Sequence, residues 1–199
     1  MKLYYAKGTC SLAVRIVINE LHVTCEFCEV DLKTHQTASG EDYYKINPKG
    51  TVSGLLLDNG ELLTENAAIM QYLADHNGNA LFPAAGLPRY QVIGWINYVA
   101  TELHKGCAPL NAAIPDSIKE EFFRPILHKK LQFLDKTLAN SNYLMGSEIC
   151  LADCYLYVVL RWLPHLGVDR KQYQNVENFF TRMQSREAVQ TSLKQEGLS

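Results

Sequence analysis

The 199-residue sequence lacks an excess of positive charge. It has 19 Lys and Arg against 21 Asp and Glu, which gives a formal net charge of -2 at pH 7. A protein that binds the phosphate backbone of nucleic acid needs a basic surface to neutralise it. The composition therefore predicts that nucleic acid is not a partner.

Long hydrophobic runs are missing as well. A membrane-spanning helix needs about 18 or more consecutive apolar residues, and the longest candidate, 154–166, is interrupted by Arg161. Near the start, Lys7 falls where a secretion signal would have its apolar core. We therefore predict a cytoplasmic protein that does not bind a membrane.

The six cysteines are an even number, which would suggest a disulfide framework in a small secreted chain but not in a cytosolic one of this size. Disulfides are rare in cytosolic proteins, so we expect most of these thiols to be reduced and buried. Cys25 and Cys28 form a CxxC pattern, but they fall in an apparent strand, where residues three apart point to opposite faces. This placement favours packing over redox or metal chemistry, and no metal site is predicted.

The first 77 residues alternate between strand and helix patterns. Apolar runs predict strands at 2–5 and 27–32 and a hairpin over 55–63, with its turn at Asp58-Asn59-Gly60. Helices are expected at 11–21, 41–45 and 64–76. This order is typical of a thioredoxin-like α/β domain.

The remainder of the chain has the pattern of helices. Residues 78–87 are rich in Gly, Pro and Ala and predict a linker. The helices expected after it cover 88–110, 116–139, 151–166, 175–185 and 187–195. The predicted organisation is a thioredoxin-like domain at 1–77, a linker at 78–87 and an all-α domain at 88–199.

Cys10 lies directly before the first predicted helix. The positive end of the helix dipole and its free N–H groups stabilise a thiolate over a thiol at such a position. The sulfur would then be nucleophilic near neutral pH. The alternative is that Cys10 is a small apolar residue in a tight turn.

Five short blocks, in order across both predicted domains, resemble the glutathione transferases and among them the bacterial beta class. They are MKLYY (1–5) leading to GTCSL (8–12), INPKG (46–50), LLTE (62–65), AIMQYLAD (68–75) and ATELHKG (100–106). The resemblance covers nearly the whole chain. It implies the cytosolic glutathione transferase fold, a role in detoxification and a homodimer.

The resemblance also implies the substrates and the catalytic residues. Glutathione would be the co-substrate, and a small hydrophobic electrophile would be its reaction partner. Cys10 would contact the glutathione sulfur and could form a mixed disulfide with it, and His104 would donate a hydrogen bond or accept a proton near the thiol.

The γ-glutamyl end of glutathione carries an ammonium and a carboxylate. The Glu65 carboxylate can take the ammonium, and the N–H of Asn66 at a helix start can take the carboxylate. The helix dipole alone would also favour a glutamate at this position. The residues that the resemblance implies for glutathione are His35, Lys49, Thr51, Val52, Glu65, Asn66 and Lys105, with Asn97 and Glu102 contributed by the partner subunit.

The sequence departs from the family pattern at three positions. Ser53 follows Val52 where the family has a cis-proline, so the sequence leaves open whether this peptide is cis or trans and whether glutathione affinity is retained. Asn66 replaces a small residue. Cys150 begins a capping box that usually begins with Ser or Thr.

Three functions remain open at this point. The first is a glutathione transferase, with thiol-disulfide exchange or peroxide reduction through Cys10 as additional activities. The second is a non-catalytic dimerisation or binding module that keeps the fold with a weakened glutathione site. The third is a glutaredoxin-like thiol-disulfide reductase.

Overall fold

The computed structural model describes residues 1–78 and 80–198. The chain divides into two compact units. Unit 1 combines Met1–Ala80 with Arg186–Ser199, and unit 2 is Leu81–Ser185. Each unit is described by itself below.

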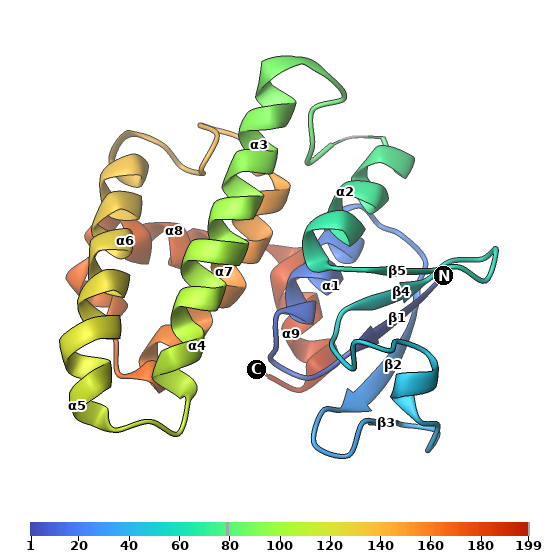
Figure 1. Cartoon of the computed structure of the whole chain (residues 1–199). Helices are drawn as coiled ribbons and strands as arrows, with labels where there is room; N and C mark the ends of the chain where they lie inside the picture. The colour runs from blue at the N-terminus through green and yellow to red at the C-terminus, as the bar shows by residue number, and fades with distance from the viewer. Residues whose placement is uncertain (79, 199) are drawn as a thin grey trace. The chain divides into compact units, whose positions relative to one another are not determined.

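Unit 1 is built on a mixed sheet with the strand order β3-β2-β1-β4-β5 (Figure 1). Strands β1 and β2 are parallel, and the other neighbouring pairs are antiparallel. The described strands are β1 (Lys2–Tyr5), β2 (Glu26–Asp31), β3 (Gln36–Thr37), β4 (Gly54–Leu56) and β5 (Leu62–Thr64). The helices of this unit are α1 (Ser11–Glu20), the 3-10 turn η1 (Tyr43–Lys45), α2 (Asn66–His76) and α9 (Glu187–Glu196).

Helix α1 lies at the centre of unit 1. Every residue from 11 to 18 is buried, which is the pattern of a helix that is covered on all sides. Helix α1 packs against both α2 and α9. The loop that leads into α1 is therefore anchored to a rigid element.

Unit 2 is helical and contains two stretches of π-helix. Helix α3 (Gly86–Tyr98) continues through the π-helical segment η2 (Val99–His104) into α4 (Lys105–Asn111). Helix α5 (Asp116–Ile118) likewise continues through the π-helical segment η3 (Lys119–Phe123) into α6 (Arg124–Thr137). The remaining elements are α7 (Leu151–Trp162), α8 (Gln174–Gln184) and the 3-10 turns η4 (Leu138–Asn140), η5 (Leu163–Leu166) and η6 (Arg170–Gln172).

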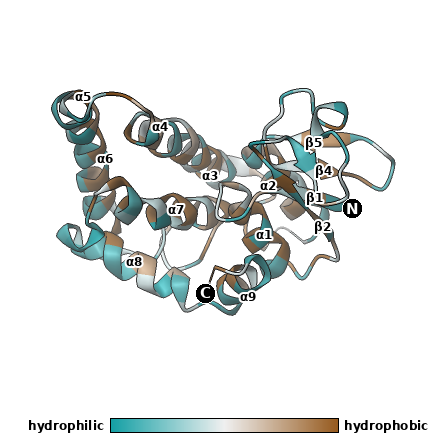
Figure 2. Cartoon of the chain, turned by 90° about the horizontal axis from the view of Figure 1, so that it is seen from below, coloured by the Kyte–Doolittle hydropathy of each residue, from teal (hydrophilic) through white to brown (hydrophobic). Residues whose placement is uncertain are grey.

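The core of unit 2 surrounds α7. All residues from 151 to 160 are buried, whereas α6 buries only Leu127, Leu131 and Leu134, at the spacing of one helix face. Both hydrophobic and hydrophilic residues are visible along α6 (Figure 2). In the part of the chain that the structure describes, no helix has both the length and the apolar character to cross a bilayer.

Most predicted elements agree with the structure within two residues. The sequence did not predict β3, which is two residues long and has no periodic signal, or the π-helical segments, which share the sequence pattern of ordinary helices. The predicted helix over 116–139 is interrupted by one of these segments.

The predicted domain boundaries follow the change from strands to helices. In the structure, α9 packs against α1 and therefore belongs to unit 1. The boundaries at 77, 78–87 and 88–199 remain a prediction. Within the predicted linker, Asn79 lies outside the described residues, and so does the end of the predicted helical domain at Ser199.

Candidate active site

Cys10 is half-buried at the start of α1, in the loop that follows β1. Its Sγ donates a hydrogen bond to the carbonyl oxygen of Val52 at 3.6 Å. The loop is fixed on both sides of Cys10, because the Ser11 hydroxyl donates to the Ala6 carbonyl at 3.1 Å and the Gly8 N–H donates to Glu196 Oε2 at 2.9 Å. This arrangement holds the sulfur at the positive end of a buried helix.

The turn before β4 places Val52 opposite this sulfur. Tyr43 Oη and Asn47 Nδ2 both donate to the Thr51 carbonyl, at 3.0 and 2.7 Å. Gly50 has φ +66°, and a Cβ there would lie 2.5 Å from a ring carbon of Tyr44. Any larger residue would therefore be strained here and would displace the Tyr44 ring.

The Val52–Ser53 peptide is cis, which answers the question that the sequence left open. The side chain of Ser53 points to α2, where its hydroxyl donates to Asn66 Oδ1 at 2.7 Å. Asn66 Nδ2 in turn donates to the Cys10 carbonyl at 2.9 Å. The structure thus brings Cys10, Val52 and Asn66 together, with Ser53 between them.

Glu65 is the last residue before α2 and has φ +74°. A non-glycine residue in this region of φ is uncommon, and such residues cluster at functional sites. The Glu65 carboxylate accepts a hydrogen bond from Lys49 Nζ at 2.7 Å, and the same ammonium donates to Thr64 Oγ1 at 3.0 Å. Both charged side chains are exposed, so they are accessible to a ligand.

The predicted residue His35 lies on the loop before β3 with φ +53°. Its ring packs on Tyr44 with the ring centroids 4.4 Å apart. Its Nδ1 atom is buried and has no hydrogen-bond partner in the described part of the chain. Within the described residues, Lys49 and Glu65 bond each other, and no hydrogen bond joins His35 to either of them.

In unit 2, His104 is the last residue of η2, and π-helical turns are frequent at functional sites. Its Nδ1 lies 2.7 Å from Tyr155 Oη, and its ring meets Trp162 edge to face with centroids 4.9 Å apart. Burial, and to a smaller extent the charge of Lys105, lower the pKa of His104 below its usual 6.5. The imidazole is therefore biased to its neutral form, which can accept a proton.

The other predicted residues of unit 2 are exposed. The Glu102 carboxylate pairs with Lys130 at 2.9 Å, and this hydrogen bond lowers the pKa of Glu102. Asn97 lies on α3 and Lys105 begins α4. Each of these side chains is at the surface of its unit.

The sequence did not predict four residues that hold the candidate side chains within each unit. They are Tyr43, Asn47, Ser53 and Tyr155. In the sequence, Ser53 stands out only as a departure from the family pattern, and that departure is the signal that could identify it. Among residues 1–78 and 80–198, no cluster of three or more His, Cys, Asp or Glu side chains could hold a metal ion.

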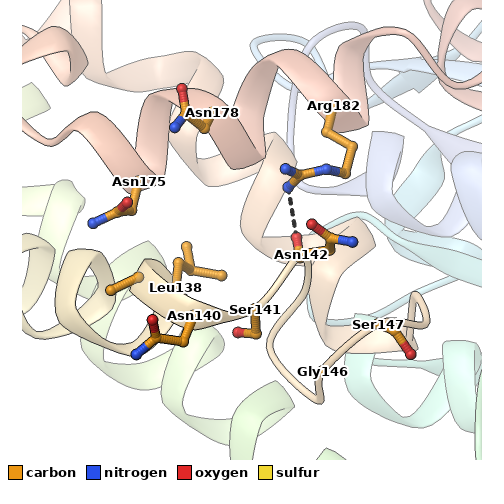
Figure 3. Close-up of a pocket in the computed structure, with 10 residues that line it drawn as sticks. Leu138, Asn140, Ser141, Asn142, Gly146, Ser147, Asn175, Asn178 and Arg182 are labelled. Atoms are coloured by element: carbon orange, nitrogen blue, oxygen red, sulfur yellow. Dashed lines mark hydrogen bonds between the residues drawn. The ribbon is translucent and has the colours of Figure 1, made fainter.

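A separate pocket of about 350 Å³ lies within unit 2 between the segment after α6 and helix α8 (Figure 3). Amide and hydroxyl side chains dominate its lining, and Arg182 Nη1 donates to the Asn142 carbonyl at 2.8 Å. None of the predicted site residues lines it. The arginine serves to hold the 141–147 loop to α8.

Comparisons with known proteins give consistent matches over the whole chain. The model of the glutathione S-transferase N-terminal domain matches residues 1–75, and that of the C-terminal domain matches residues 114–187. The chain is 42% identical to the glutathione S-transferase GstA of Escherichia coli O157:H7, with 100% of both chains covered.

Solved structures with the same fold include bacterial glutathione S-transferases. A sphingomonad glutathione S-transferase in complex with glutathione is 39% identical, with a TM-score of 0.94 and 100% of both chains covered. The beta class glutathione S-transferase of Sphingomonas chungbukensis is 38% identical, with a TM-score of 0.95 and the same coverage. These similarities bear out the predicted family resemblance and the predicted fold class.

Proposed function

Since the chain belongs to the glutathione S-transferase family, we propose that it binds glutathione in unit 1 and directs the glutathione thiolate against a small hydrophobic electrophile. We further propose that Cys10 gives the enzyme thiol-disulfide exchange or peroxide reduction as a second activity. The observation that carries the proposal is the position of Cys10 at the start of α1, with its sulfur 3.6 Å from the Val52 carbonyl.

The charges of unit 1 suit the two ends of glutathione. The Glu65 carboxylate takes the γ-glutamyl ammonium, which replaces Lys49 as its partner, and the first N–H groups of α2 take the γ-glutamyl carboxylate. Lys49 is then free to bind the glycyl carboxylate at the other end of glutathione. His35 and Thr51 bind the same end. Val52 pairs with the extended cysteinyl backbone of the tripeptide.

The chemistry needs a proton acceptor for the glutathione thiol. We assign this role to His104, whose lowered pKa keeps it neutral at physiological pH, and Lys105 adds positive charge for the thiolate. The thiolate sulfur forms a bond to the electrophilic carbon as the leaving group departs. With a disulfide substrate, the Cys10 thiolate attacks one sulfur and the other leaves as a thiolate, so that Cys10 carries the mixed disulfide until glutathione reduces it.

We also propose that two copies form a homodimer in the cytoplasm, and that Asn97 and Glu102 contribute to the site of the other copy. Exposed apolar side chains on and beside α3 and α6 support this proposal, because such surface favours association. They are Tyr90, Phe122, Ile126 and Phe133, which are 50 to 68% exposed. A monomer in sedimentation equilibrium at micromolar concentration would contradict it.

The variant Cys10→Ala tests the role of the thiol. We expect disulfide exchange with glutathione to fall by roughly 100-fold or more, while Cys25→Ala, which removes another half-buried thiol of unit 1, leaves it unchanged. Mass spectrometry of the wild type should detect a glutathionyl group on Cys10. If Cys10→Ala keeps both conjugation and exchange, the thiol has no part in the mechanism.

Calorimetry with glutathione separates the enzyme from a non-catalytic module. Micromolar binding is expected for a transferase, and the absence of binding at millimolar glutathione would favour a module that keeps only the fold. Exchange activity without conjugation of any electrophile would favour a glutaredoxin-like reductase.

A further inference from the structure

Two buried side chains connect the segments that surround Cys10. Ser53 is 3% exposed and Asn66 is 7% exposed. The Ser53 hydroxyl donates to Asn66 Oδ1 at 2.7 Å, and Asn66 Nδ2 donates to the Cys10 carbonyl at 2.9 Å. The Asn66 amide therefore uses its acceptor and one donor within the protein.

These bonds close a ring of contacts around the sulfur. The Cys10 carbonyl also accepts the N–H of Ala13 at 3.1 Å, so it is held by α1 as well as by Asn66. Ser53 follows Val52 directly, and the Val52 carbonyl accepts the Cys10 thiol. The ring thus runs from the Cys10 carbonyl through Asn66, Ser53 and Val52 back to the Cys10 sulfur.

We propose that Asn66, together with Ser53, is a positioning residue that holds the Cys10 thiol against the Val52 carbonyl. The proposal rests on the proposed function only in that Cys10 and Val52 take part in glutathione chemistry. In this ring the two side chains bond each other and the Cys10 carbonyl. They act through two backbone carbonyls, one on Cys10 itself and one on the residue that Cys10 bonds.

The hydrogen bonds of the Asn66 side chain also limit which of its groups can bind a ligand. Its side-chain oxygen and one amide hydrogen are occupied by Ser53 and Cys10. The γ-glutamyl carboxylate would therefore be held at this position by the backbone N–H at the start of α2 rather than by the Asn66 side-chain oxygen. A substitution of the Asn66 side chain should therefore change the position of Cys10 more than it changes the binding of the γ-glutamyl carboxylate.

The test is the rate at which Cys10 reacts with iodoacetamide in the absence of glutathione, measured for each cysteine by peptide mass spectrometry. Cys25 and Cys28 of the same unit are the internal references. The variants are Asn66→Leu, which has a similar size but no hydrogen bonds, Ser53→Ala, and the double variant.

We expect labelling of Cys10 relative to the references to rise about 3- to 10-fold in Asn66→Leu and in Ser53→Ala, as the loss of one hydrogen bond predicts. The double variant should not exceed Asn66→Leu, because both residues act in one chain of contacts. The KM for glutathione should rise in the same variants more than kcat falls.

An unchanged Cys10 ratio in Asn66→Leu would overturn the proposal, and so would a parallel rise at all three cysteines, which indicates a general loosening of unit 1. The proposed function fails separately. If Cys10→Ala retains full activity while the labelling ratios change as expected, the positioning role stands and the catalytic role of Cys10 does not.

Discussion

Cys10 depends on residues that are far from it in the sequence. Val52, which accepts its thiol, is 42 positions away, and Asn66, which holds its carbonyl, is 56 positions away. The Gly8 N–H of the same loop is bound by Glu196, 188 positions along the chain. A cysteine before a helix is a common pattern. The contacts with distant segments are what fix the position of this one.

His104 gives the protein a specific dependence on pH. Burial lowers its pKa in the folded state below 6.5, so the unfolded chain binds a proton more readily than the folded protein does. Its contribution to stability is complete above about pH 6.5 and is lost as the pH falls through the lowered pKa. We expect urea unfolding at pH 8, 7, 6 and 5 to show a smaller decline for His104→Gln than for the wild type.

Lys105 provides the control for this prediction. Its charge is the second cause of the lowered pKa, so Lys105→Gln should raise the pKa of His104 in an NMR titration without removing the imidazole. In a plot of the conjugation rate against pH, the acid limb should shift to higher pH in this variant. Equal slopes of stability against pH in His104→Gln and the wild type would contradict the assignment.

At the scale of the element, the residues at the starts of three helices take part in the candidate site or in the packing of the fold. Helix α1 begins after Cys10, α2 begins after Glu65, and α7 begins after Cys150. At α7 the Asp153 carboxylate, which is fully buried, accepts the N–H of Cys150 at 2.8 Å and that of Leu144 at 2.9 Å. The Asp153 half of the predicted capping box is therefore present, although its first residue is a thiol.

Asp153→Ala should lower the free energy of unfolding by about 2 to 4 kcal/mol, because two buried N–H groups lose their acceptor. Urea denaturation measures the change. Glu148→Ala removes an exposed carboxylate in the loop just before α7 and should change stability by less than about 0.5 kcal/mol. Similar midpoints for the two variants would show that the cap contributes little.

At the scale of the whole molecule, the last helix completes the first unit. Helix α9 packs on α1, and Arg15 Nε pairs with Glu196 Oε1 at 3.0 Å with both side chains almost fully buried. The Arg15 guanidinium also lies over the rings of Tyr5 and Phe27, at 4.2 and 3.8 Å from their centroids. The chain therefore returns to the unit in which it began.

Glu196→Ala should destabilise the protein by about 3 to 5 kcal/mol, because it leaves the Arg15 charge buried without its carboxylate. Denaturant unfolding of the purified protein gives this value. The double variant Arg15→Met with Glu196→Leu replaces the pair by apolar groups and should lose less than Glu196→Ala alone. If the double variant loses more, the pair itself stabilises the fold.

Most of the fold could be predicted from local sequence patterns. The period of apolar residues gave the helices near 11–21, 151–166 and 175–185, and Asp58-Asn59-Gly60 gave the β4-β5 hairpin. The two-residue strand β3 and the π-helical segments have no distinct pattern, because the packing around them determines their hydrogen bonds. The grouping of α9 with unit 1 also depends on contacts between the ends of the chain.

The candidate site could be predicted only as a set of residues. Short blocks around Cys10, Lys49, Glu65 and His104 indicated the family and the positions of the functional side chains. They did not show that Lys49 pairs with Glu65 or that Ser53 and Asn66 bond each other. Each of these pairs joins segments more than ten residues apart, and a local pattern carries no information about such a pair.

The sequence by itself determined the family, the order of the elements and the residue types that the chemistry needs, because periodicity, turn residues and short motifs are local properties of the chain. The tertiary structure alone decided the cis geometry at 52–53, the ring of contacts around Cys10 and the neutral bias of His104. The physical reason is that hydrogen-bond partners and burial arise only when distant segments pack together.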